Sequence, residues 1–285
     1  MIKWLGFILA LGLIIRVVFL ATVPPELFGD EVDVAYQAYS LLKTGRDIYK
    51  QPLPIYIHSL SEWRAPLPVY QTVPAVALLG LNEYGARIPE VVMGVLSPLI
   101  LFIFVYQQSR SKKLAFWSAV AMTLMPWHII YSRMAAFGAV TLINLLMLMV
   151  ISFKSSRYYL GILLAALCFY TYNTAFIFVP MILLGLKYFP KIKHVLWGVV
   201  LLLPLGYYLI LGPVGDRFGQ LSIVRSKEFI ESINLGRIDH PGIVGKLIYN
   251  RYTEFAKVFS SNYLQSFSTE FLFMTKFQFN NMVRA

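Results

Sequence analysis

The sequence predicts an all-α integral membrane protein, a bundle of about seven spans with interfacial helices in its first extracytoplasmic loop. Of its 285 residues, 58% are hydrophobic and only 14% are charged, and the mean hydropathy is +0.65. Soluble domains carry about 25% charged residues, so this chain has too little polar surface for a water-soluble particle. No Asp or Glu falls between Val91 and Gly215. These observations exclude an ordinary cytosolic enzyme.

The spans are predicted from apolar stretches close to the roughly 20 residues that cross a bilayer as a helix. The stretch from Tyr158 to Phe189 is too long for one crossing, and the polar triplet Tyr172, Asn173 and Thr174 divides it into two. The other spans run from about Trp4 to Thr22, Ile88 to Gln107, Leu114 to Tyr131, Phe137 to Phe153 and Val195 to Gly212. We expect the first span to remain uncleaved, because Arg16 interrupts its apolar run and no clear small-residue cleavage site follows.

The charges set the orientation of these spans. Short basic connections belong in the cytoplasm by the positive-inside rule, and they contain Arg110, Lys112, Lys113, Lys154 and Arg157. Seven crossings from a cytoplasmic N-terminus end outside, which makes all 14 carboxylates extracytoplasmic. The net charge of +11 therefore reflects orientation in a plasma membrane and not nucleic-acid binding.

The sequence divides into a transmembrane module, 1–212, and an extracytoplasmic tail, 213–285, with a predicted amphipathic helix from Ile243 to Phe259. The first extracytoplasmic loop, 23–87, holds a predicted helix from Val32 to Lys43 that ends at Thr44 and Gly45. The apolar segment from Pro66 to Leu81 is predicted to form a helix that lies in or dips into the outer membrane interface, because a span there would put the basic connections on the wrong side.

Acidic side chains gather at the start of this loop. Asp30 falls at the N-cap position of the predicted helix, where capping contributes about 1 kcal/mol. Beside Glu31 it could also act as a general base at the membrane surface. Asp30 and Glu31, with Asp33, leave open a site for a divalent cation, although three acids in four residues also mark a helix start.

Cationic and aromatic residues are predicted on the same side. Arg64, Arg87 and Arg133 lie near span ends, where arginines bind a phosphate bidentately or extend to lipid headgroups. Arg16 lies inside the first span, where a charge usually finds a partner. His128, next to Trp127, is interpreted first as a residue of the aromatic belt at the membrane interface. Tyr172 is interpreted as a residue that either lines an outer cavity or only places its polar group at the membrane interface.

Several strings occur in a characteristic order. They are PPELFGDE (24–31), YSLLKTGRD (39–47), WRAPL (63–67), GLNEYGARIP (80–89), PWH (126–128), SR (132–133) and YTY (170–172), with NYL (262–264) and FLF (271–273) in the tail. Together they resemble the phospholipid carrier-dependent glycosyltransferases of the GT-C fold, relatives of the protein O-mannosyltransferases and the lipid A aminoarabinose transferase. The resemblance covers nearly the whole chain.

The resemblance implies an enzyme that moves a sugar from a polyprenyl-phosphate carrier to an extracytoplasmic acceptor, a lipid, glycan or protein, with inversion. Asp30 matches the catalytic carboxylate, Glu31 its acidic neighbour and Arg87 the arginine before the second span. Arg64 lies where many relatives have Lys, and Ala65 where proline is usual. With Arg133, and with His128 and Tyr172 nearby, the arginines are expected to bind the donor phosphate.

The expected partners are the lipid-linked donor, membrane lipids and an unidentified acceptor. Relatives generally continue through further spans, so we expect this chain to correspond to the N-terminal portion of such an enzyme. Two alternatives remain open, an inactive truncated remnant and a non-enzymatic transporter or flippase of lipid-linked sugars. A transporter would be expected to place ionisable groups near the middle of the membrane, whereas most charges here lie at the outer edge.

Overall fold

The structure, a computed structural model of the whole chain, describes residues 2–59, 62–135, 138–186, 191–210, 227–265 and 267–268, which are mainly α-helical. The chain forms two compact units, Met1–Val214 and Gly215–Ala285. The predicted boundary at residue 212 and the string at 271–273 lie outside the described residues.

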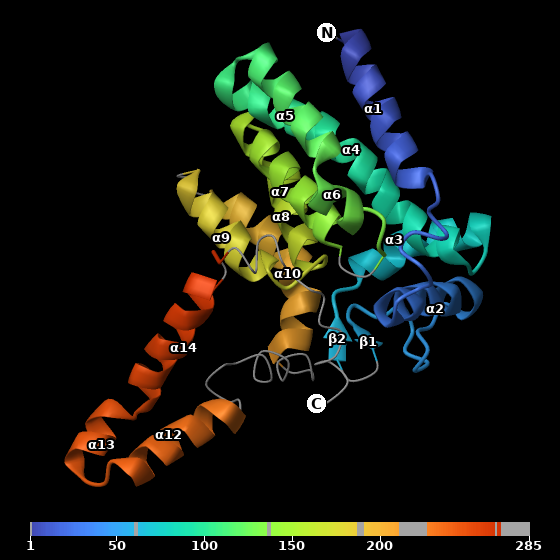
Figure 1. Cartoon of the computed structure of the whole chain (residues 1–285). Helices are drawn as coiled ribbons and strands as arrows, with labels where there is room; N and C mark the ends of the chain where they lie inside the picture. The colour runs from blue at the N-terminus through green and yellow to red at the C-terminus, as the bar shows by residue number, and fades with distance from the viewer. Residues whose placement is uncertain are drawn as a thin grey trace. The chain divides into compact units, whose positions relative to one another are not determined.

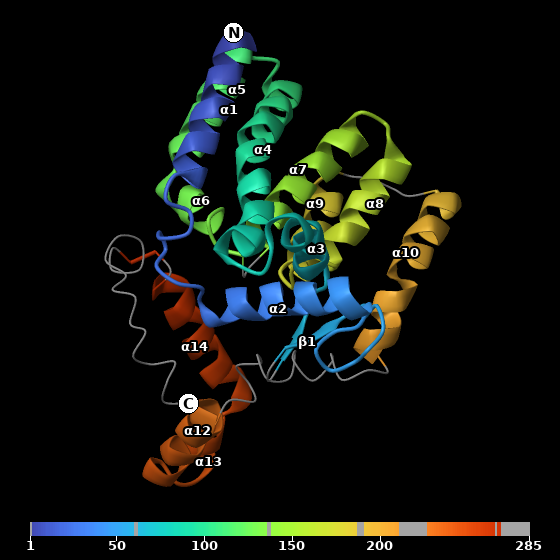
Figure 2. The same ribbon diagram turned by 90° about the vertical axis from the view of Figure 1, so that its right-hand side faces the viewer.

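The first unit is a set of mostly apolar helices with a smaller layer of helices and strands at one end (Figures 1 and 2). Its elements are α1 (Ile2–Val17), α2 (Gly29–Thr44), β1 (Ile57–Ser59), β2 (Glu62–Arg64), α3 (Leu67–Leu79), α4 (Glu83–Ser109), α5 (Lys112–Leu124), α6 (Pro126–Tyr131), α7 (Ala139–Lys154), α8 (Tyr158–Phe169), α9 (Ala175–Gly185) and α10 (Ile192–Ile210). The connections α4–α5 and α7–α8 lie toward the end that holds the N-terminus, and α2, α3 and the strands lie toward the opposite end.

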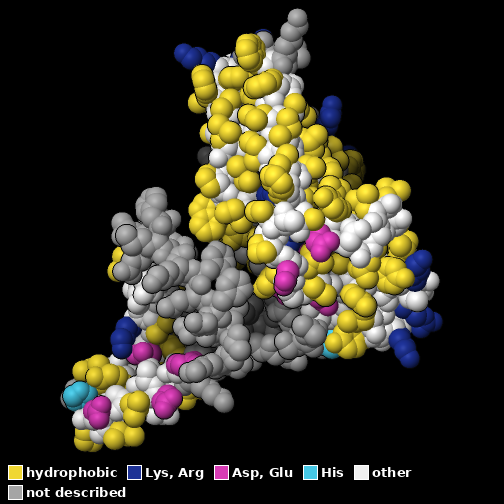
Figure 3. All heavy atoms as spheres, turned by 45° about the vertical axis from the view of Figure 1, so that its right-hand side comes forward, with side chains coloured by type: hydrophobic (Ala, Val, Ile, Leu, Met, Phe, Trp, Pro, Cys, Tyr) yellow, Lys and Arg dark blue, Asp and Glu magenta, His cyan; other side chains and the backbone are white. Residues whose placement is uncertain are grey.

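Two of the described helices, α4 and α10, are long and apolar enough to cross a membrane by length and composition. The helices α1, α7, α8 and α9 are apolar but shorter, with 16, 16, 12 and 11 residues. Crossing by seven spans therefore stays a prediction. Hydrophobic side chains cover much of the face of the first unit seen in Figure 3, as a lipid-facing surface would require.

The helix boundaries differ from the predicted spans at two places and agree at another. The first helix, α1, ends at Val17, before the predicted end of the first span near Thr22. The third span is wrong as a single helix, because α5 ends at Leu124 and Pro126 begins α6. Proline has no N–H for the preceding turn but is well suited to the first position of a new helix. The division at 172–174 is confirmed as a helix break between α8 and α9.

The first loop contains both predicted helices and a hairpin that was not predicted. Gly45 ends α2 with φ +66° and donates its N–H to the Leu41 carbonyl over 2.9 Å, a left-handed C-cap that suits glycine. The helix α3 occupies most of the segment predicted as interfacial. Strands β1 and β2 pair antiparallel with Ile57 opposite Arg64. The all-α prediction thus misses a two-stranded sheet, and this sheet positions Arg64.

Two apolar clusters fix these elements. One joins α7, α8 and α9 through buried side chains that include Leu145, Met149 and Cys168. The other joins α2, β1 and α3 through Val34, Ala38, Leu41, Ile57, Val69 and Val76. The second cluster packs one face of α2 against α3 and the sheet, so the polar first turn of α2 is held in a fixed position.

The second unit contains α12 (Lys227–Asp239), α13 (Ile243–Ile248) and α14 (Arg251–Gln265). The predicted single helix from Ile243 to Phe259 is wrong, because the chain breaks between α13 and α14. Asn250 caps the start of α14, since its Oδ1 accepts the N–H groups of Tyr252 (2.9 Å) and Thr253 (3.1 Å).

Candidate functional site

The first turn of α2 carries the acids that the sequence singles out. The N-cap is Phe28, with φ −71° and ψ 153°, so Asp30 lies inside the helix and its predicted capping role is wrong. Glu31 takes part of that role, because its Oε2 accepts the Phe28 N–H over 3.2 Å. A negative charge here is still favoured by the helix dipole.

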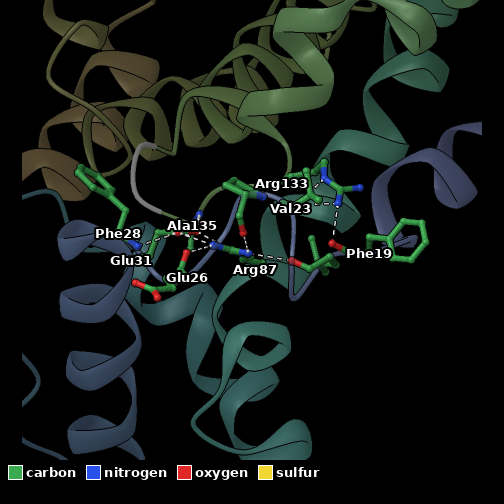
Figure 4. A network of polar contacts seen from close by, with 10 residues as sticks. Phe19, Val23, Glu26, Phe28, Glu31, Arg87, Arg133 and Ala135 are labelled. Atoms are coloured by element: carbon green, nitrogen blue, oxygen red, sulfur yellow. Dashed lines mark hydrogen bonds and ion pairs between the residues drawn. The ribbon is translucent and has the colours of Figure 1, made fainter. Parts of the chain in front are cut away.

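Arg87, from the start of α4, is fully enclosed by acceptors (Figure 4). It donates bidentately to Glu31 over 3.0 and 2.9 Å, and its other bonds go to the backbone carbonyls of Leu20 (2.7 Å), Pro24 (3.0 Å) and Glu26 (2.6 Å). A guanidinium has five N–H donors, and all five are used here. The prediction that Arg87 binds phosphate does not fit this geometry, because no donor faces a ligand.

Glu31 is equally saturated. Besides Arg87 and Phe28, it accepts the backbone N–H of Ala135 over 2.9 Å, so four hydrogen bonds occupy its two oxygens. The side chain is 1% exposed. A carboxylate with both oxygens occupied cannot act as a general base or as a metal ligand. The oxygens of Glu31 therefore do not support the divalent cation that the sequence left open for Asp30 and Glu31. Across the described ranges, no group of three His, Cys, Asp or Glu forms a metal site.

Arg133, in the connection after α6, holds the end of the first helix. It donates to the carbonyls of Ile15 (2.7 Å), Phe19 (3.0 Å) and Val23 (3.1 and 2.7 Å). The last carbonyls of a helix have no partner within it, and a cation also suits the negative end of the helix dipole. Burial, and then the nearby Arg87 cation, lower the pKa of Arg133. Its contacts indicate a structural role and do not show the predicted phosphate contact.

Arg16 has the partner that its place inside the first span predicts. It lies 2.7 Å from Nδ1 of His128 and donates to Ser132 Oγ (2.9 Å) and to the Gly12 carbonyl (3.0 Å). Arginine only donates, so we assign Nδ1 as the acceptor and place the ring proton of His128 on Nε2. His128 is buried, with 7% exposed, and its interpretation as an interfacial belt residue is wrong.

A second ion cluster joins α2 to β2. Arg64 pairs with Asp30, and its Nε lies 3.7 Å from Oδ2 of Asp33. The two acids are three residues apart on α2 and so share one face of the helix. The side chain of Asp30 is 33% exposed, against 6% for Asp33. Asp30 is therefore the acid of this cluster that an external molecule can reach.

Tyr172 lies in the turn between α8 and α9 with its side chain 37% exposed. A backbone hydrogen bond from Leu67 N–H to the Tyr170 carbonyl (2.9 Å) joins this turn to the start of α3. Within the ranges that the structure describes, Tyr172 makes no hydrogen bond with Asp30, so the structure does not join it to the acid.

Sequence reasoning missed Glu90 as an internal group. This residue of α4 is 2% exposed, and its Oε1 accepts from Gln71 (2.8 Å) and Thr141 (3.2 Å). No described residue pairs with its Oε2. The available signal was its position inside a helix apolar enough to cross a membrane, where an ionisable group is a functional candidate.

No protein-family model, curated protein or solved structure matches the chain. A functional conclusion therefore depends on the geometry of the ion cluster formed by Asp30, Asp33 and Arg64.

Proposed function

We propose that the protein is a membrane glycosyltransferase that uses a polyprenyl-phosphate-linked sugar, with Asp30 as its general base. The observation that carries this proposal is the state of Asp30. It is part-exposed and paired with the cation of Arg64, whereas nearby Glu31 and Arg87 use their polar atoms in internal contacts.

The proposed reaction needs few groups from the protein. Asp30 takes the proton of the acceptor hydroxyl, the acceptor oxygen forms a bond to C1 of the sugar, and the bond from C1 to the phosphate oxygen breaks. Displacement from the opposite face inverts the configuration at C1. The lipid phosphate leaves with the bonding electrons, and Arg64 stabilises its charge. Arg64 is the arginine that the structure places beside Asp30.

The distribution of charge and apolar surface supports a bilayer around the helices. The helices α4 and α10 are long enough to span, and the basic connections lie toward the end of the first unit that is opposite α2 and the hairpin. With that basic end in the cytoplasm, Asp30 faces the outer surface of a plasma membrane. A carrier lipid and an extracytoplasmic acceptor would meet there.

The test measures sugar transfer by the full chain in isolated membranes. The probes are polyprenyl-phosphate mannose, glucose and aminoarabinose, and the readout is release of free polyprenyl phosphate. We expect Asp30→Asn to lower the rate by about 100-fold or more, because general-base catalysis contributes about that much. We expect Arg64→Gln to lower the rate as well, and Arg64→Lys to retain part of it, because Lys keeps the charge but not the planar fork.

Glu26→Gln is the matched control, since Glu26 is an exposed acid of the same loop. Its contact with Arg87 is made by its backbone carbonyl, which the substitution keeps. It should leave the rate unchanged. Unfolding temperatures of all variants separate loss of activity from loss of structure. Full activity of a folded Asp30→Asn protein would exclude Asp30 as the base. A folded wild-type chain that releases no lipid phosphate from any probe would overturn the proposal and favour the inactive or transport alternatives.

A further inference from the structure

A groove lies between α8, α9 and α10, on helices that carry none of the proposed catalytic groups. Its volume is about 520 Å³, and its lining is apolar apart from His194. Residues from all three helices contribute, among them Ile162, Phe169, Val179, Leu183 and Leu202. An apolar groove of this size suits a hydrocarbon chain.

A second hollow lies beside the first on the surface of α10. All of its described lining residues belong to α10, so it is a shallow, open strip of apolar surface, and it shares Val195, Gly198 and Leu202 with the groove. The neighbouring side chains of α10 are strongly exposed, with Leu203 60% and Val199 49%. The groove and the strip meet along α10, so each acyl chain of a two-chain lipid has an apolar surface to lie against.

The groove ends in a basic, aromatic region. His194 lies there, with its ring centroid 5.3 Å from that of Tyr158 and 5.2 Å from that of Tyr159. Lys193 is exposed, and its Nζ lies 5.7 Å from the centroid of the Tyr159 ring. Lys191, at the start of α10, is exposed as well. No acid occurs in the sequence between Val91 and Gly215 to neutralise these cations locally.

We infer that this groove is a binding site for a diacyl phospholipid with an anionic headgroup. The acyl chains lie in the two hollows, and the phosphate lies at Lys191 and Lys193. Basic pockets between membrane helices bind anionic headgroups, each cation near the surface adding to the attraction. The start of α10 lies on the side of the first unit away from α2 (Figure 2), so this site is separate from Asp30.

Gly198 provides a way to block the hollows without disturbing the helix. A Cβ at this position would meet only Cγ2 of Ile162 at 3.5 Å, an ordinary contact. A leucine side chain therefore extends from α10 into the shared space. Gly198→Leu tests the hollows, and the double variant Lys191→Gln with Lys193→Gln tests the headgroup contact.

The experiment uses the full chain in detergent, with phosphatidylglycerol or phosphatidylcholine added in mixed micelles. Native mass spectrometry counts bound lipid, and thermal unfolding reports stabilisation. We expect phosphatidylglycerol to bind more tightly than phosphatidylcholine. The double lysine variant should lose roughly tenfold or more of its affinity for phosphatidylglycerol, and Gly198→Leu should lose binding of both lipids. Inorganic phosphate without acyl chains should not stabilise the protein.

The matched control is Lys112→Gln with Lys113→Gln, which removes the same charge from the exposed first turn of α5. It should leave phosphatidylglycerol binding unchanged. The inference is overturned if both lipids bind equally, or if the control pair loses as much affinity as Lys191 and Lys193. The inference assumes the bilayer location given under the proposed function, but the assay needs no sugar. Loss of sugar transfer in Asp30→Asn with lipid binding intact, or loss of lipid binding in Gly198→Leu with sugar transfer intact, therefore separates the two proposals.

Discussion

At the scale of single residues, two buried glutamates of the first unit, Glu31 and Glu90, differ in how their carboxylates are stabilised. A buried carboxylate needs a cation or hydrogen-bond donors, because its desolvation is costly. Glu31 has Arg87 and two backbone N–H groups. Glu90 has the neutral donors Gln71 and Thr141, and no Lys, Arg or His of the described chain forms an ion pair with it.

These environments predict different effects of the same substitution. Glu31→Gln removes the charge that balances Arg87, and breaking a buried pair costs about 3–5 kcal/mol, so the unfolding temperature should fall by about 10 °C. Glu90→Gln removes no ion pair and keeps an acceptor for Gln71, so we expect a change within about 1 kcal/mol. Thermal unfolding of both variants in one detergent makes the comparison. Equal losses would contradict the distinction between a paired and an unpaired acid.

The polar contacts explain which residue roles could be predicted from the sequence and which could not. A phosphate-binding arginine and an arginine that fixes the fold have the same sequence signature near a span end. Arg87 and Glu31 are separated by 56 positions, and Arg133 donates to Ile15 of α1 across 118 positions. Only the tertiary structure shows that their donors are already used. Asp30 could be singled out because its acidic neighbourhood and its helix are local in sequence. Arg64 was a candidate as well, but the sequence could not distinguish it from Arg87 and Arg133 as the partner of Asp30.

At the scale of elements, α1, α4 and the α6–α7 connection pack closely around Arg16. Gly94 of α4 makes this approach possible, because a Cβ there would lie 2.3 Å from Cβ of Ser132 and 3.0 Å from Nε of Arg16. Ser132 also accepts a hydrogen bond from Arg16. A larger residue would therefore move the acceptor and strain the contact between the helices.

We expect Gly94→Ala to destabilise the fold by about 1–3 kcal/mol, the usual cost of overpacking. Gly6→Ala is the matched control, because nothing lies within 4 Å of a Cβ at Gly6 in α1. It should be neutral or stabilising by up to about 1 kcal/mol, since alanine favours a helix over glycine. Chemical or thermal unfolding of both variants measures the difference, and a stable Gly94→Ala protein would show that α4 can move away from Ser132.

Among the elements, the sequence predicts long helices better than short strands and helix breaks. Long apolar runs identify helices such as α4 and α10 well, because the pattern is strong and continuous. The hairpin was missed because β1 and β2 have three residues each, too few for an alternating pattern to stand out. The break between α5 and α6 had a signal in Pro126, which a count of apolar residues overlooks.

At the scale of the whole molecule, topology is the prediction with the widest consequences. The chain has one cysteine, Cys168, and it is fully buried, so new cysteines can be labelled against a low background. We expect a membrane-impermeant maleimide to label the exposed Gln51→Cys in intact cells and Lys112→Cys only after the cells are opened. Labelling of both from the same side would contradict the charge-based orientation.

The contacts of Arg133 also have a consequence for the order of assembly. The carbonyls of Ile15 and Val23 receive their side-chain donors from a residue 118 and 110 positions later in the chain. Synthesis from the N-terminus therefore completes α1 well before the group that fixes its end exists. Until Arg133 is made, the start of the proposed catalytic loop is not held in place, so the loop reaches its final geometry only after α6 has been made.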